Sequence, residues 1–424
     1  MPSRNAPSSP VSERKRLGNW LPADESAVAE FRLRLCRQAR ESAGGGPRSE
    51  AVRALHTLLR DDATLRMGLT RAIGEASDAG YALGYRDIDE LMLVVDYLMS
   101  YAPPFSDSSL VVCPLNAVFD WPMCMPSGYA VFRHPVFNKQ IRRVLTAWSA
   151  FLGGPHSRAH LNSGSPDGWF SAEADAKIGL SQFVTHRELP YWGFLSWNDF
   201  FTRRFREGAR PVEAPDDPRI IVSPCEAKPY ALRRDVRLAD DFWIKSQPYS
   251  LRDMVGAHEE DLARRFVGGT VYQAFLNAYS YHRWHAPVGG TIVKAYNLAG
   301  TYYSCAEAQG PDPEGLNDSQ GYTSAMAARA VIVVEADDPA VGQIACVFIG
   351  MGEVSSCRVE VVPGQRVSKG EELGCFQYGG STICMLFEPG KVDEIVWDPT
   401  RIGVDDGQAQ PGGVKVNAHL ATAR

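Results

Sequence analysis

The sequence predicts an α+β protein in which a helical N-terminal domain, residues 17–186, precedes a β-rich domain, residues 187–424. Apolar residues recur at helical spacing in the first part, whereas short β-branched runs alternate with Gly and Pro turns beyond Arg210-Pro211. A chain of 424 residues also exceeds one ordinary hydrophobic core, so two domains are expected. Residues 1–16 are polar and charged, and we expect them to form a disordered tail.

Composition and charge narrow the class of protein. An apolar content of 45%, a charged content of 22% and a net charge of −6 are typical of a globular protein whose main partner is not a nucleic acid or an anionic lipid surface. No apolar run approaches the roughly 18 residues of a membrane span, so stable membrane insertion is not expected. The nine cysteines include no C-x-x-C pair, which favours reduced thiols in the cytoplasm and no metal site.

The helical part is predicted to contain four long helical stretches. Helical periodicity covers residues 26–40 and 49–73, and a further helix starts at Asp87 or Asp89. The last stretch covers 135–152 and ends at a Gly-Gly-Pro sequence. An apolar loop is expected between these helices, at residues 118–126.

The second part is predicted to be built from short strands. Its β-branched runs are separated by Gly and Pro, which is typical of an antiparallel sheet or barrel. Residues 363–370 fit a hairpin turn in a small barrel. The predicted strands contain residues 220–222, 269–271, 291–293, 331–334, 346–349 and 359–362.

A small-residue turn near the C-terminus, Gly379-Gly380-Ser381-Thr382, lies between two apolar runs that are predicted to be strands. The glycines permit backbone conformations barred to other residues, so the Ser381 hydroxyl can reach the carbonyl of its own preceding peptide. That geometry is required for an intramolecular N→O acyl shift. Considered alone, the motif is more often a glycine-rich turn with a surface serine.

Two histidines, His282 and His285, precede a Pro-Val-Gly-Gly turn. In a helix both imidazoles share a face, and in an extended segment they diverge. Metal binding is one interpretation, but no further ligands follow at a usual spacing. Acid–base roles are another, because histidine titrates near neutral pH. The simplest alternative is a pair of ordinary hydrogen-bonded histidines.

Two further stretches have less specific patterns. Glu226 follows a short strand and a proline, where a solvated loop acid is the usual explanation. Residues 196–205 form an amphipathic pattern that leads into Arg210-Pro211, and plain packing explains it equally well.

Together, and in this order, the four stretches resemble the phosphatidylserine decarboxylase family of pyruvoyl enzymes. The family's Phe-Phe-Thr-Arg…Arg-Pro segment corresponds to residues 200–211, its Tyr-His-Arg-x-His-x-Pro segment to residues 281–287, and its Gly-Ser-Thr to residues 380–382. The helical part, with Trp169 and residues 191–194, is similar to a soluble branch that includes the tryptophan decarboxylase of psilocybin biosynthesis.

The resemblance implies a self-processing enzyme. The chain would be cut between Gly380 and Ser381, Ser381 would become the pyruvoyl cofactor, and the two chains so formed would stay associated. By family position His285 is the base for cleavage, Glu226 orients it, and His282 donates the proton in turnover. The family more often has Asp-Gly where this chain has Glu226-Ala227, which changes the reach of that carboxylate by one methylene.

Three functions follow from these observations. The preferred one is decarboxylation of a free aromatic L-amino acid, L-tryptophan to tryptamine. The second keeps the chemistry but takes phosphatidylserine and makes phosphatidylethanolamine. The third is a binding module of biotinyl-carrier type with no enzymatic role. The sequence does not identify the residues that line the side-chain pocket.

Overall fold

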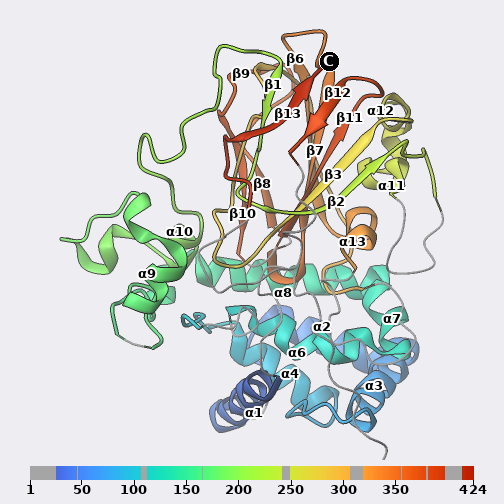
Figure 1. The fold of residues 1–424 in the computed structure, drawn as a ribbon. Coiled ribbons are helices and arrows are strands. Elements are labelled where there is room, and N and C mark those ends of the chain that lie inside the picture. Colours follow the sequence, from blue (N-terminus) through green and yellow to red (C-terminus); the bar gives the residue numbers. More distant parts are fainter. Residues whose placement is uncertain are drawn as a thin grey trace, which may run out of the picture.

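The computed structural model describes residues 25–44, 46–106, 112–164, 166–240, 249–305, 319–354, 356–378, 381–396 and 413–424. The predicted tail, 1–16, and Gly380 lie outside these ranges. Within them, a layer of helices lies against one end of a β-rich body (Figure 1), as the α+β prediction requires.

The predicted helices are present, with one stretch divided in two. Residues 49–73 contain two helices, because the side chain of Asp62 interrupts the run and caps the second by accepting a hydrogen bond from the Leu65 amide. Asp87 caps the next helix through the Glu90 amide. The helices are α1 Glu25–Ser42, α2 Glu50–Asp61, α3 Ala63–Asp78, α4 Ile88–Leu98, α6 Pro114–Cys124, α7 Pro126–Arg133, α8 Pro135–Leu152, α9 Ala172–Ile178 and α10 Trp197–Phe201.

The expected loop at residues 118–126 is wrong, because most of it belongs to α6. Every residue of α6 is buried, so the helix has no polar face and its sequence shows no amphipathic period. Pro122 removes the amide that would bond to the Val118 carbonyl. The Tyr85 hydroxyl donates to that carbonyl instead, at 2.7 Å, which compensates for the proline inside the helix.

The β-rich part contains one seven-stranded antiparallel sheet and two three-stranded sheets. The large sheet has the order β2-β3-β11-β7-β6-β5-β9, and the smaller ones are β4-β10-β8 and β1-β13-β12. The predicted run 359–362 contributes only Val359, the last residue of β8. The strands are β1 Ile220–Val222, β2 Lys228–Arg234, β3 Thr270–Leu276, β4 Arg283–His285, β5 Gly290–Leu298, β6 Arg329–Ala336, β7 Gln343–Gly350, β8 Ser356–Val359, β9 Arg366–Val367, β10 Glu372–Gln377, β11 Ser381–Phe387, β12 Val392–Ile395 and β13 His419–Ala423.

Three short helices, α11 Leu251–Val255, α12 Glu260–Arg265 and α13 Gln320–Met326, accompany the large sheet. One end of this sheet faces the helical layer (Figure 1). At that end Ser381, the first residue of β11, pairs with Leu276 of β3 and Gly350 of β7. Tyr378, just before β11, packs into the core of the helical layer, edge-on to Trp148 of α8 with 4.7 Å between ring centroids. Tyr378 and Ser381 therefore lie where the two parts of the chain meet.

Candidate active site

Ser381 is buried at the start of β11. Its strand neighbours on both sides hold the backbone in register, and its side chain is fully enclosed. Its hydroxyl oxygen makes no hydrogen bond to any residue that the structure describes. The next residue differs, since Thr382 donates to the Ala274 carbonyl at 2.9 Å and accepts from Gln273 at 3.0 Å. Among the described residues, partners exist for the Thr382 hydroxyl but not for that of Ser381, which suits a nucleophile and a cofactor precursor.

The two histidines point to opposite sides. The segment is extended rather than helical, since β4 begins at Arg283, so residues three apart diverge. His282 is fully buried and stacks on Phe201 of α10 with 4.0 Å between ring centroids. Its carbonyl accepts from the Phe376 amide at 2.9 Å, which places it near the end of β10 that leads to Ser381.

His285 is held at both ring nitrogens. Nδ1 lies 2.8 Å from the Gly370 carbonyl and Nε2 lies 2.8 Å from the Tyr281 hydroxyl. Because a carbonyl can only accept, Nδ1 carries the proton in the neutral ring and Nε2 accepts from Tyr281. Burial lowers the pKa of His285, and the Gly370 hydrogen bond opposes this only in part. The imidazole is therefore neutral near pH 7, as a general base must be.

Glu226 is engaged by an arginine. Its carboxylate forms a two-point ion pair with Arg210, with Nε–Oε2 and Nη2–Oε1 distances of 2.8 and 2.5 Å. Both side chains are largely buried. Among the residues described, no hydrogen bond joins Glu226 to His285, although the charge of Glu226 contributes to the raised pKa of Tyr281, whose main cause is burial. The structure brings Glu226 to the neighbourhood of the histidine and its tyrosine partner without direct contact.

The segment 200–211 supports the histidines. Arg203 is buried and donates to the Tyr279 carbonyl at 2.7 Å, and burial lowers its pKa to about 10. Arg283 donates in the opposite direction, to the Thr202 carbonyl at 2.7 Å. These reciprocal bonds fix the chain on both sides of His282, so this motif acts by positioning.

Sequence reasoning assigned no role to two residues of this site. Tyr281 and Arg210 were both visible as parts of motifs, but their partners, His285 and Glu226, became apparent only in three dimensions. The spacing of Tyr281 and His285 offered no signal, because an extended segment separates residues four apart unless the chain turns.

Comparison with known proteins identifies the family. A sequence model described as phosphatidylserine decarboxylase matches residues 197–416, and a second of the same description matches residues 49–178. Decarboxylase iboD of Amanita muscaria is 40% identical over 296 residues, covering 65% of this chain and 84% of that protein. The L-tryptophan decarboxylase of Psilocybe cyanescens is 36% identical over 322 residues, covering 70% and 71%. The L-tryptophan decarboxylase of Psilocybe cubensis is 29% identical over 414 residues, covering 91% and 92%.

These matches span both the helical part and the β-rich part, and they confirm the resemblance carried by the motifs. In the portion of the chain that the structure describes, no helix has the length and apolarity needed to cross a membrane. This chain therefore belongs to the phosphatidylserine decarboxylase family and is a carboxy-lyase.

Proposed function

We propose that this chain is a pyruvoyl-dependent decarboxylase of a free aromatic L-amino acid, with L-tryptophan as substrate and tryptamine as product, in the cytoplasm. The buried, unengaged hydroxyl of Ser381 at the start of β11 is the observation that carries the pyruvoyl assignment. The L-tryptophan decarboxylases of two Psilocybe species support the substrate.

Self-processing would begin with attack of the Ser381 hydroxyl oxygen on the Gly380 carbonyl carbon. The hydroxyl proton passes to a base, the C–N bond breaks, and the amide nitrogen becomes an amine while an ester forms. Loss of the Cα proton of residue 381 then eliminates the Gly380 carboxylate and leaves dehydroalanine, which takes up water and releases ammonia to give the pyruvoyl end. The two chains stay joined because β11 pairs along its whole length with β3 and β7, which belong to the other fragment.

His285 is the proposed base for this cleavage by family position, and its lowered pKa keeps the ring neutral near pH 7. Gly370 and Tyr281 engage both of its ring nitrogens, so the Tyr281 hydroxyl has to leave Nε2 before this atom can take the serine proton. Glu226 is a positioning residue in this proposal: held by Arg210, it acts on the Tyr281–His285 pair through its charge. The sequence-based role, direct orientation of His285, is thereby replaced with an indirect one.

His282 is the proposed proton donor in turnover. The pyruvoyl group supplies an electron sink for the charge released when CO2 leaves. His282 lies beside the end of β10 that leads to Ser381, and Phe201 fixes the plane of its ring. An oriented imidazole in this place can return a proton to the substrate α-carbon.

Intact mass and substrate turnover test the proposal. We expect the wild-type protein to give two chains that divide before residue 381, with a terminal mass fitting pyruvoyl, and Ser381→Ala to stay whole. Ser368→Ala, at an exposed turn, is the matched control and should be cut. CO2 release is then measured with tryptophan, tyrosine, phenylalanine and phosphatidylserine. An uncut wild-type chain would refute the pyruvoyl assignment, and release from the phospholipid alone would establish the alternative substrate.

A further inference from the structure

Glu353 links the β-rich part to the helical layer next to the cleavage motif. It belongs to the short helix η5, Gly352–Val354, which follows β7, and is 4% exposed. One carboxylate oxygen, Oε1, accepts from the Asn116 amide in the first turn of α6 at 2.6 Å. A carboxylate at this position complements the helix dipole.

Several polar atoms around Glu353 have no hydrogen-bond partner among the described residues. They are Glu353 Oε2, the hydroxyls of Tyr303 and Tyr378, and both amide atoms of the Asn116 side chain. All four side chains are at least nine-tenths buried. The charge of Glu353 contributes, after burial, to the raised pKa of Tyr303 and Tyr378, so these groups share one neighbourhood.

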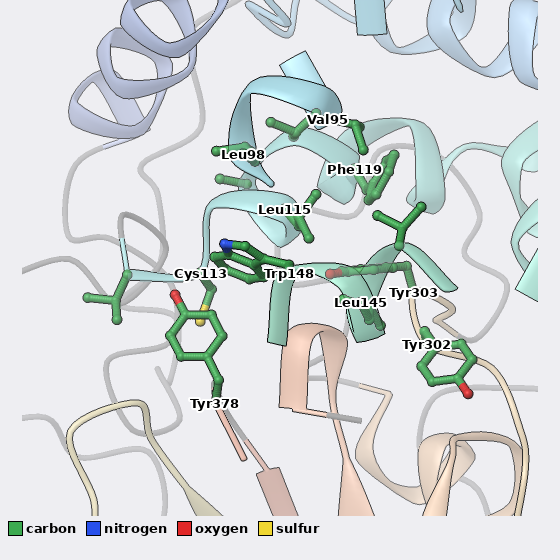
Figure 2. Close-up of a cluster of buried hydrophobic side chains, with 14 of the residues drawn as sticks. Val95, Leu98, Cys113, Leu115, Phe119, Leu145, Trp148, Tyr302, Tyr303 and Tyr378 are labelled. Carbon is green, nitrogen blue, oxygen red and sulfur yellow. The ribbon is translucent and has the colours of Figure 1, made fainter. Parts of the chain in front are cut away.

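Buried polar groups are normally paired, so this concentration of unpaired ones calls for a partner that the described residues do not supply, such as a water, an ion or a polar ligand. Figure 2 shows the Tyr378 hydroxyl directed toward Cys113 and the Tyr303 hydroxyl directed toward Trp148. The Tyr378 hydroxyl thus lies by Cys113, the residue before α6, and the Tyr303 hydroxyl is directed toward Trp148, which packs edge-on to Tyr378. The charge of Glu353, bound at the start of α6, acts on both tyrosines.

This region is within reach of a substrate held at residue 381. Gly350, the strand partner of Ser381, precedes Glu353 by three residues, and three extended residues span at most about 10 Å. Tyr378 precedes Ser381 by three residues as well.

The surroundings of these polar atoms are aromatic. Trp148 packs edge-on to Tyr378, and Phe119 lies 5.0 Å from the Tyr303 ring, centroid to centroid. Aromatic rings favour edge-on and offset contacts with a further ring. A buried acceptor among such rings suits an aromatic ligand that carries its own N–H or O–H donor.

We propose that Glu353 forms the side-chain end of the substrate pocket, where Oε2 accepts a hydrogen bond from a donor on the aromatic ring of the amino-acid substrate. For tryptophan the donor is the indole N–H. This inference rests on the proposed function and deepens it, since it names the residue that selects the side chain.

A purely structural role for Glu353, as a cap on α6, makes a different prediction. Glu353→Gln keeps an oxygen for the Asn116 amide but places an N–H₂ group, a donor, where Oε2 was. If Glu353 only caps α6, Glu353→Gln should leave turnover unchanged or lower it equally for all substrates. If Glu353 binds the indole N–H, the variant should lose its preference for substrates that carry this donor.

The test compares substrates with and without the donor. With the mature wild-type enzyme we expect kcat/KM for tryptophan to exceed that for 1-methyltryptophan by about 10- to 100-fold. Glu353→Gln should lower kcat/KM for tryptophan by about the same factor while leaving phenylalanine within about threefold. Glu371→Gln, an exposed carboxylate at a turn, is the matched control and should change neither.

Calorimetry gives a second readout that does not depend on turnover. The Kd of tryptamine should rise about tenfold in Glu353→Gln, while that of 1-methyltryptamine stays the same. Equal losses for all ligands, or no discrimination by the wild type, would overturn the inference. Release of CO2 from phosphatidylserine alone would instead refute the proposed function, and equal tryptamine and 1-methyltryptamine affinities would then separately refute the role of Glu353.

Discussion

The hydroxyl of Tyr281 lies 2.8 Å from Nε2 of His285, while the Gly370 carbonyl takes the opposite nitrogen at the same distance. This pair of contacts selects one tautomer of a buried imidazole. It also makes Tyr281 a positioning residue whose effect on the base can be measured.

We expect Tyr281→Phe to slow self-cleavage by roughly tenfold and to move the acid limb of its pH–rate profile to higher pH. The hydroxyl donates to the neutral ring, so its removal raises the pKa of His285. In the wild type burial lowers this pKa below its usual value, so cleavage should proceed at full rate at pH 7 and fail only on acidification. Gel time courses between pH 5 and 8 measure this.

Tyr296→Phe is the control for that experiment. The Tyr296 hydroxyl donates to the Val255 carbonyl at 2.8 Å, away from the histidines, and its loss should leave the profile in place. An unchanged profile in Tyr281→Phe would mean that Tyr281 does not act on the base.

The two histidines should separate cleavage from turnover. His285→Ala is expected to remain a single chain, because the base is lost. His282→Ala should be cut but decarboxylate more slowly by about 10²- to 10⁴-fold, since protonation by a positioned side chain is worth that much. Denaturing gels and CO2 release report the two steps, and His258→Ala, an exposed histidine, should be normal in both. The reverse pattern would exchange the two assignments.

The Arg210–Glu226 pair should matter for stability as well as for processing. Arg210→Ala leaves a largely buried carboxylate without its partner, and we expect a loss of about 3 kcal/mol in the free energy of unfolding. Urea unfolding in the uncut Ser381→Ala background measures it. Arg366→Ala breaks an exposed pair with Asp337 and should cost about 0.5 kcal/mol. Similar losses in the two variants would show that the Glu226 pair is no more than a surface contact.

Glu353 should make stability depend on pH. Burial raises its pKa from 4.5 to about 7, and the nearby Asp120 acts in the same direction. The folded state then binds the Glu353 proton more tightly than the unfolded state does. The contribution of Glu353 to the free energy of unfolding is therefore complete below about pH 4.5 and is lost as the pH rises toward 7. The full effect is on the order of 3 kcal/mol.

The difference in Tm between the Ser381→Ala chain and its Glu353→Gln derivative, measured from pH 4.5 to 8, isolates this contribution. Tyr303, Tyr378 and Asp120 also lie near Glu353. Burial holds the pKa of both tyrosines well above this range, and Asp120 is present in both proteins. We expect the Tm of the Glu353 protein to fall relative to that of the Gln variant as the pH rises to about 7. Above this pH the two curves of Tm against pH should run parallel. Parallel curves throughout would exclude a titrating Glu353.

The sequence predicted elements well where the physical signal was local. Helix α8 has the predicted bounds, residues 135–152, because its apolar face repeats at the helical period and Gly ends it. Helix α6 was missed because it is buried on every side, so its sequence has no amphipathic period, and because it contains Pro122, which usually interrupts a helix. Both features favoured a loop. The hydroxyl that compensates for this proline comes from Tyr85, far from it in the chain.

The sequence by itself determined the family, the carboxy-lyase chemistry and the candidate residues, because those depend on residue types in a specific order. Only the tertiary structure decided which groups meet. In the folded chain Arg210 pairs with Glu226 and Tyr281 hydrogen-bonds to His285. Glu353 accepts a hydrogen bond from the start of a helix 237 residues earlier in the chain. Such contacts depend on how packed layers approach one another, and no local periodicity or motif spacing encodes that approach.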